Sequence, residues 1–208
     1  MQAMRRIVLV VAALALGCGM GAPPGDAPAP EALPTEESSL LVPPGYGTLL
    51  QDQISLQLQA GDLQVKVTPL SEWVIRLAAP DTYTRLRGLA EIHGARAARS
   101  AATRDPSLFL VSLFSYRPDV TYEPEDLLLV NRGLRLRPLG IAPITPSWGT
   151  HRLEQQETRM AIYAFESGVD LEGDLAVEYQ DLRNEVWRER VLPLLRAERA
   201  KALARARG

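Results

Sequence analysis

The stretch QISLQLQAGDLQVKVTP, residues 53–69, contains the pattern that decides the fold. Apolar and polar residues alternate through its first half, which places Ile54, Leu56 and Leu58 on one side, and they alternate again through its second half. Alternation over this length is typical of a half-buried β-strand. The short glycine-containing segment Ala60-Gly61-Asp62 separates the two runs, as expected for a hairpin loop. The stretch therefore predicts two antiparallel strands, each with one face on a core.

Further short strands are expected along most of the chain. The run 108–116, LFLVSLFSY, is apolar on both faces apart from its serines, which is typical of a central strand. Asn131-Arg132-Gly133 predicts a hairpin turn between two more strands. The other strand-like segments are 72–77 (EWVIRL), 127–130, 134–136, 158–166 and 175–179. About eight short strands with no regular βαβ alternation predict antiparallel sheets that cover one another.

Two helices are expected beside these strands. Asp81 is a candidate N-cap, and Tyr83, Leu86, Ala90 and His93 follow at helical spacing. Gly94 is expected to end or weaken this helix, and the Arg/Ala-rich stretch 95–105 is expected to be mobile or a frayed helix. The end of the chain is rich in Ala, Leu, Arg and Lys and predicts a second helix from Pro193, since proline favours a first helical position.

The combined prediction is a mainly β fold, an antiparallel immunoglobulin-like β-sandwich with a helical insertion and a C-terminal helix. A small barrel is the alternative. The strand rhythm loosely resembles that of immunoglobulin-like domains of exported bacterial proteins. The paired cysteines of antibody domains are absent, because the chain has one cysteine.

That cysteine, Cys18, directly follows a short apolar run. The chain begins MQAMRRIVLVVAALALGC, with Arg5 and Arg6 before uncharged residues 7–16. This run is too short to span a bilayer as a helix, which takes roughly 20 residues. A positive start, a short apolar run and then small residues are typical of a secretory signal peptide.

Gly17-Cys18 and the preceding apolar run resemble the lipobox of bacterial lipoproteins. The commonest pattern has Leu three residues before the cysteine, where this chain has Ala15. The resemblance implies cleavage before Cys18 and a diacylglyceryl group on its thiol. It implies attachment to a membrane of the bacterial cell envelope, with the domain in the periplasm or at the cell surface. Because Gly19 is not the aspartate that retains lipoproteins at the inner membrane, the outer membrane is favoured.

Four segments are expected on these grounds. Residues 1–17 are the signal peptide, and residues 18–45, rich in Pro and Ala, are a lipid-anchored linker that cannot bury a core. Residues 46–187 are the β-sandwich domain. Residues 188–208 are a basic helix with a net charge of +5, and residues 1–18 carry +2. Because the whole chain carries −2, residues 19–187 carry −9. The tail either docks on the domain through Val191, Leu192 and Leu195 or contacts an anionic membrane surface.

No set of residues for catalysis or tight metal binding stands out. The two histidines, His93 and His151, have no cysteine partners for zinc, and no nucleophile motif accompanies them. Two acidic clusters, 119–126 (Asp119, Glu123, Glu125, Asp126) and 170–174 (Asp170, Glu172, Asp174), offer oxygen ligands of the kind that calcium prefers. Solvated turns are the simpler interpretation. Tyr163, Phe165 and Trp73 are expected to pack in the core or on a sheet.

These observations favour a lipid-anchored envelope protein that is not an enzyme. Its domain is expected to bind another protein or support an envelope assembly, with no cofactor and no nucleic-acid partner. The alternative is a lipoprotein that binds a ligand or calcium through the acidic loops. A hydrolase with an unrecognised site is a third hypothesis.

Overall fold

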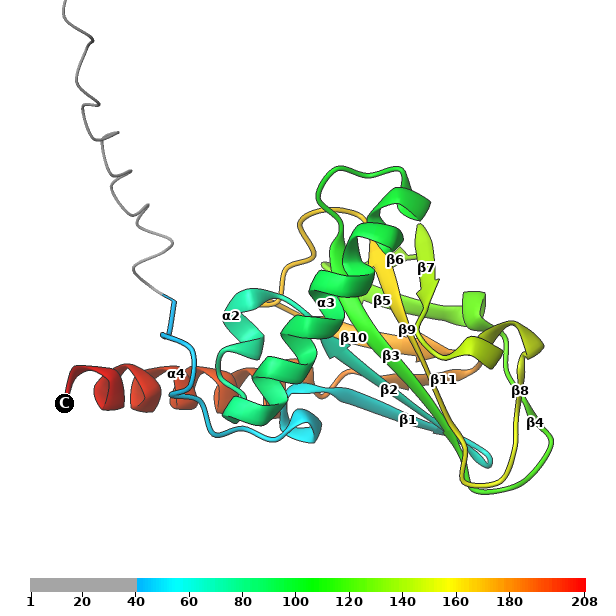
Figure 1. Ribbon diagram of the computed structural model, residues 1–208, viewed down its shortest axis with the longest axis horizontal. Coiled ribbons are helices and arrows are strands. Elements are labelled where there is room, and N and C mark those ends of the chain that lie inside the picture. The colour runs from blue at the N-terminus through cyan, green and yellow to red at the C-terminus, as the bar shows by residue number, and fades with distance from the viewer. Residues whose placement is uncertain (1–40) are drawn as a thin grey trace, which may run out of the picture. The chain divides into compact units, whose positions relative to one another are not determined.

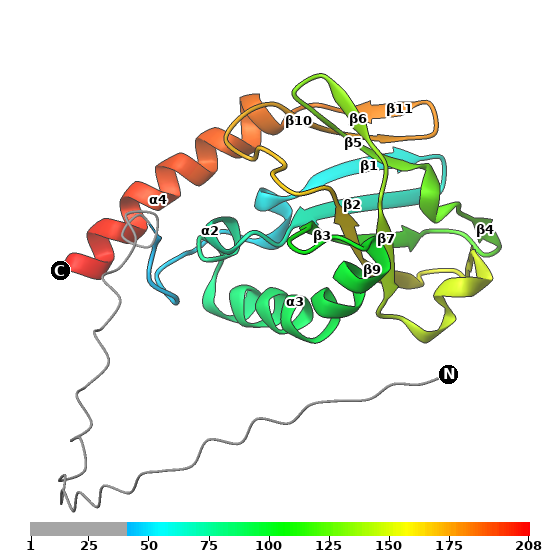
Figure 2. The same ribbon diagram turned by 90° about the horizontal axis from the view of Figure 1, so that it is seen from above.

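Helix α3 (Pro80–Ala101), a five-stranded sheet and a four-stranded sheet are stacked in that order (Figures 1 and 2). The computed structural model describes residues 41–208, which belong to one compact unit. The predicted signal peptide, Cys18 and most of the predicted linker lie outside the described residues. No helix within 41–208 is long and apolar enough to cross a membrane.

All strand pairs in the sheets of the described region are antiparallel. The five-stranded sheet has the order β1 (Leu56–Ala60), β2 (Leu63–Pro69), β3 (Ser107–Ser115), β9 (Thr158–Phe165) and β7 (Gly140–Pro143). The four-stranded sheet has the order β11 (Leu182–Asn184), β10 (Leu175–Tyr179), β5 (Leu127–Asn131) and β6 (Leu134–Leu136). A third pair joins β4 (Val120–Thr121) to β8 (Arg152–Leu153).

The predicted hairpin at 53–69 is confirmed. Strands β1 and β2 pair with Leu56 opposite Val67 and Leu58 opposite Val65, and all four side chains are buried in the core. The first strand begins later than the alternation suggests, because Gln51–Ile54 form a 3₁₀ turn, η1. Ile54 is nevertheless fully buried. The second hairpin is also confirmed, with Arg132 and Gly133 in the left-handed conformation between β5 and β6.

The predicted strand at 72–77 is wrong. Its first half is a short helix, α2 (Glu72–Ile75), which begins when the Ser71 carbonyl accepts the N–H groups of Val74 and Ile75. Consecutive residues Val74 and Ile75 are both buried. A half-buried strand would point these neighbours to opposite faces, so tertiary packing overrides the local alternation here.

The expectation that α3 weakens at Gly94 is also wrong, since the helix continues to Ala101. Gly94, Ala97 and Ala101 are buried against the five-stranded sheet. A Cβ on Gly94 would lie 2.9 Å from Cδ1 of Leu108. The small residues of this stretch therefore let the helix lie close to the sheet, and they do not signal fraying.

Strand β7 is not among the segments expected to be strands, and it ends at Pro143. Pro143 is tolerated because β7 is the edge strand of its sheet and pairs only with β9. Helix α3 covers this edge closely: a Cβ on Gly140 would lie 2.6 Å from the backbone nitrogen of Ala101 and 2.7 Å from the carbonyl oxygen of Ala97.

Helix α4 (Leu192–Arg207) follows a π-helical turn, η4 (Trp187–Val191), and confirms the predicted C-terminal helix. Strand accounts for 33% of the structure and helix for 35%. Antiparallel sheets and a C-terminal helix are thus shown, while the immunoglobulin-like topology is not confirmed. The edge strands β1 and β11 of the two sheets lie side by side, and the Asn184 side-chain amide donates to the Gln57 carbonyl at 2.7 Å.

The contact between α3 and β7 gives a stability prediction. We expect Gly140→Ala to destabilise the protein by about 1–3 kcal/mol, because the new methyl group collides with helix backbone that has no room to shift. Gly88→Ala is the matched control: it has open space on the same helix and should stabilise by up to about 1 kcal/mol. Urea unfolding measures both, and equal stabilities of the two variants would contradict the contact.

Candidate functional site

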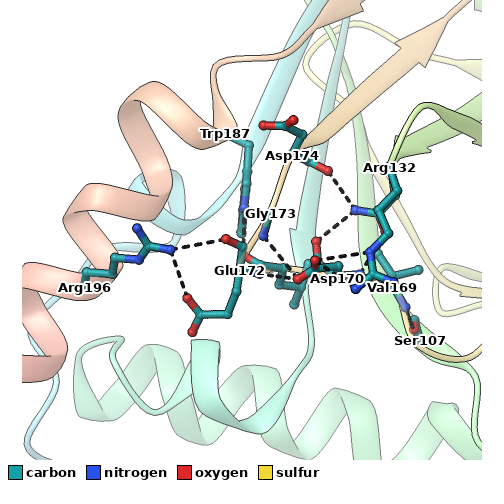
Figure 3. A network of polar contacts seen from close by, with 11 residues as sticks. Ser107, Arg132, Val169, Asp170, Glu172, Gly173, Asp174, Trp187 and Arg196 are labelled. Atoms are coloured by element: carbon teal, nitrogen blue, oxygen red, sulfur yellow. Dashed lines mark hydrogen bonds and ion pairs between the residues drawn. The ribbon is translucent and has the colours of Figure 1, made fainter.

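The acidic residues of the β9–β10 connection are held in place by Asn131. Its side-chain amide donates to the carbonyls of Asp170 and Asp174, both at 2.8 Å, and its Oδ1 accepts the Asp170 N–H at 2.9 Å. We call residues 170–174 the acidic loop. It lies between Arg132 on one side and Arg196 of α4 on the other (Figure 3).

Within the acidic loop, the half-buried Asp170 carboxylate is held by Arg132 and by two backbone groups of the loop. Its Oδ2 accepts from Arg132 Nη2 at 3.1 Å, and its Oδ1 accepts the N–H groups of Glu172 and Gly173. The Arg132 hydrogen bond, aided by those of the two backbone groups, holds the pKa of Asp170 below its ordinary value of 3.8, although burial opposes this shift. Asp170 is therefore an ionised structural anchor of the loop.

The other two carboxylates face the C-terminal helical segment. Glu172 pairs with Arg196 at 3.4 Å and with Arg199 at 3.1 Å, and Asp174 pairs with Arg188 at 3.1 Å. Beneath these exposed pairs, Leu192, Leu195 and Ala202 are buried against the rest of the domain. The basic tail is thus docked, and its charge is directed in part at the acidic loop.

Two tryptophans complete this junction: Trp187, which the sequence analysis did not single out, and Trp73, which packs against the core as expected but lies on helix α2 and not on a sheet. Trp187 is fully buried and donates its Nε1–H to the Leu171 carbonyl at 3.0 Å. Trp73 is half-buried, and the Arg199 guanidinium lies 4.6 Å from its ring centroid, within the range of a cation–π contact. The surplus of apolar and aromatic residues around 187–195 was the only sequence signal for docking.

The carboxylates of the acidic loop have little capacity left to bind a calcium ion. All three of its carboxylates accept hydrogen bonds from arginine or backbone donors. Within residues 41–208, no group of three or more His, Cys, Asp or Glu side chains is arranged to hold a metal ion. In the described geometry, Glu172 pairs with arginines of α4, Asp174 pairs with Arg188 of η4, and Asp170 holds the loop itself.

The first acidic cluster, 119–126, is a surface segment fixed by buried tyrosines. The hydroxyl of Tyr163 donates to the Pro124 carbonyl at 2.9 Å, and that of Tyr179 accepts the Glu123 N–H at 3.1 Å. Burial raises the pKa of both phenols. The four carboxylates of the cluster lie on exposed residues, and Asp119 pairs with Arg152 at 2.9 Å. As predicted, Tyr163 and Phe165 are core residues.

The two histidines lie on separate elements. His93 is half-buried on α3, and His151 is an exposed residue in the left-handed conformation after a 3₁₀ turn. His151 Nδ1 lies 3.7 Å from a Glu123 carboxylate oxygen. Within residues 41–208, neither imidazole is hydrogen-bonded to a serine or threonine hydroxyl, so the geometry does not assemble a nucleophile and base around them.

One half of the five-stranded sheet is left open by α3. Leu110 of β3 and its partner Ile162 of β9 are fully buried on the helix side of the sheet. The next pair on the same face, Ser112 and Met160, is only half-buried. A hollow of about 470 Å³ lies there, which we call the open-sheet groove. It is lined by Gln51, Gln64, Lys66, Arg85, Ser112, Phe114, Thr158 and Met160.

The charge of this groove is positive within an acidic body. Lys66 pairs with Asp52 at the rim. Arg85 of α3 donates to the neutral Gln51 side chain and, among residues 41–208, has no carboxylate within 4 Å. The half-buried side chains of Phe114 and Met160 give the floor an apolar part, and hydroxyl and amide groups surround it.

We expect Asp170→Asn to destabilise the protein by about 1 kcal/mol at pH 7, the scale of one hydrogen-bonded partner lost. Because the folded pKa of Asp170 is lowered, its contribution is present above the unfolded value near 3.8 and is lost as the pH falls below it. Urea unfolding of wild type and variant should therefore differ at pH 7 and converge toward pH 3. Glu166→Gln, at an exposed residue of the same connection, is the control. A difference that is the same at both pH values would contradict an ionised anchor.

Comparisons with known proteins found no matching family model and no matching curated protein. Among solved structures, the chain is similar to the crystal structure of a functionally unknown protein from Listeria monocytogenes EGD-e. The identity is 16%, the match covers 63% of this chain and 72% of that chain, and the TM-score is 0.31.

Proposed function

We propose that the protein is a lipid-anchored component of the bacterial cell envelope whose folded part binds another protein and performs no catalysis. The resemblance of Gly17-Cys18 to a lipobox supports the anchor, and the Pro/Ala-rich segment that follows supports a tether. The outer membrane is the favoured membrane. In this proposal the stacked antiparallel sheets correspond to the predicted sandwich, and an immunoglobulin-like relationship stays a prediction.

The open-sheet groove is the observation that carries the binding half of the proposal. The rest of the five-stranded sheet is covered by the four-stranded sheet or by α3. The uncovered part of the face on the α3 side offers apolar, hydroxyl and amide groups together. A concave surface with an apolar floor and a few polar groups is the usual form of a recognition site. A rigid sheet also keeps these groups in fixed positions before a partner arrives, which lowers the entropic cost of binding.

The chemistry of the groove favours an acidic segment of a partner protein. Lys66 and Arg85 supply two cations against the single carboxylate of Asp52. A carboxylate of the partner would give Arg85 the bidentate acceptor that it lacks among the described residues. Met160 and Phe114 suit an apolar side chain next to that carboxylate, since methionine adapts its shape to its contacts.

The anchor is tested at Cys18. We expect cells that make the wild-type protein to incorporate labelled palmitate into it, and expect Cys18→Ala to abolish the label, because the thiol is the acceptor of the lipid. The variant should accumulate as precursor or in a form released without detergent. Unlabelled wild type that is soluble after lysis would exclude the anchor.

The groove is tested by photo-crosslinking in intact cells. A photoreactive residue in place of Gln64 should give a discrete protein adduct, because Gln64 lines the groove. Arg85→Glu in the same protein should reduce the adduct at least about tenfold, the effect of replacing an attractive charge contact with a repulsive one.

Two controls make the result specific to the groove. Arg207→Glu makes the same charge change on an exposed residue of α4 and should leave the adduct unchanged. A photoreactive residue in place of the exposed Glu166 should not capture the same protein. Adducts at position 166 but not at 64 would place the interface elsewhere and refute the groove.

A further inference from the structure

The chain from Val42 to Leu49 is fastened to the domain before the first strand begins. Val42 is buried, and its carbonyl accepts from Arg76 Nη1 at 3.3 Å. The Leu49 N–H donates to the Leu77 carbonyl at 3.0 Å, and the Leu49 carbonyl accepts the Ala79 N–H at 2.9 Å. The folded part thus starts ahead of residue 46, where the change in composition suggested a boundary.

The other side of this segment is held by α4. Glu198 is buried with 5% of its surface exposed, although it belongs to a basic helix. Its Oε1 accepts the N–H of Thr48 at 3.0 Å and the hydroxyl of Thr48 at 2.9 Å, and it also accepts from Arg205. Arg205 in turn donates to the Tyr46 carbonyl at 2.6 Å. Loss of these donors would leave a buried carboxylate without partners and would strongly destabilise the folded protein.

Gly47 allows the close approach between these two sides. A Cβ at this position would lie 2.3 Å and 2.4 Å from the carbonyl carbon and oxygen of Leu77, and 2.6 Å from the carbonyl oxygen of Ala78. We call the contacts of residues 42–49 with Arg76–Ala79 and with Glu198 and Arg205 the N-terminal clamp. Figures 1 and 2 both show α4 beside this first described part of the chain.

We propose that the N-terminal clamp is a mechanical attachment point, through which tension on the chain ahead of residue 41 passes into α4 and residues 76–79 before it reaches the sheet. Strand β1 follows shortly afterwards and hydrogen-bonds within its sheet only to β2. Tension applied directly to β1 would detach an edge strand. The clamp comes first along the chain, so its contacts must break before β1 is loaded.

This inference goes beyond the proposed function and does not require the anchor to be a lipid. It assigns a role to the C-terminal helix: α4 closes over the segment where the chain joins the domain. It also explains why a carboxylate is buried in a helix that is otherwise basic. The terminal helix and the first packed segment form one attachment unit, although 150 residues separate Thr48 from Glu198.

Single-molecule pulling tests the proposal on the full-length chain without lipid. One handle is attached to Cys18, and the other to a cysteine that replaces the exposed Asp62 in the β1–β2 turn. Tension then crosses the clamp and β1 alone. We expect a first rupture that releases residues 42–49, about 30 Å of chain at about 3.5 Å per residue, followed by a separate release of β1.

Variants of the clamp identify the contacts that resist. Glu198→Ala and Arg205→Ala should each shorten the lifetime of the clamped state at constant tension by about tenfold or more, the scale of lost hydrogen bonds to a charged group. Arg205→Ala removes an exposed side chain, so it keeps the test valid if Glu198→Ala fails to fold. Lys201→Ala, on an exposed residue of the same helix, should change nothing. A single rupture of clamp and β1 together, or lifetimes equal in all variants, would overturn the proposal.

Discussion

The close contact of α3 with the five-stranded sheet is the constraint on which the rest of the structure depends. At Gly140 the backbone of the helix leaves no room for a Cβ, and at Gly94 a Cβ would lie 2.9 Å from the Leu108 side chain. This contact fixes the helix over one half of the sheet and seals the β7 edge. The other half of this face stays open to solvent. It carries Gln64, Lys66 and Ser112 at positions that would be apolar if a second helix covered them. The position of the groove follows from where the helix lies, and the backbone contact at Gly140 is the closest point of that packing.

Charge in this protein is arranged mainly to hold its own parts together. The acidic loop and the basic C-terminal helix have opposite sign and lie in different parts of the sequence, and they meet in the fold through Glu172 and its two arginines. Exposed ion pairs of this kind contribute little individually. Their effect is to select one orientation of α4, whose binding free energy comes from the buried residues Leu192 and Leu195. The net charge of the segment alone therefore did not distinguish docking on the domain from contact with an external partner.

Strongly periodic segments could be predicted from the sequence, and segments shaped by packing could not. The alternation of 53–69 and the turn at 131–133 gave both hairpins, because their signals are local. The segment 72–77 also alternates, but Val74 and Ile75 are buried together in the short helix α2, so the local alternation does not describe which side chains face the core. Gly94 was expected to end or weaken α3 and the Arg/Ala-rich stretch after it to be mobile or frayed, whereas Gly94, Ala97 and Ala101 are buried against the sheet in a continuous helix. At the candidate sites, the roles of Asn131 and Glu198 depend on partners that are distant in sequence, Asp170 and Thr48, and no local pattern marks them.

The stacking of Arg199 on Trp73 makes the C-terminal helix optically visible. The protein has three tryptophans, and their surroundings differ. Trp148 is buried beside Tyr122 and Tyr163, and Trp187 is buried under the acidic loop. Only the indole of Trp73 is half-exposed and covered by a side chain of α4. If the outer turns of α4 lifted away, the fluorescence emission of Trp73 would change while that of Trp148 stayed constant. Local opening of α4 therefore has a fluorescence signal that differs from that of global unfolding.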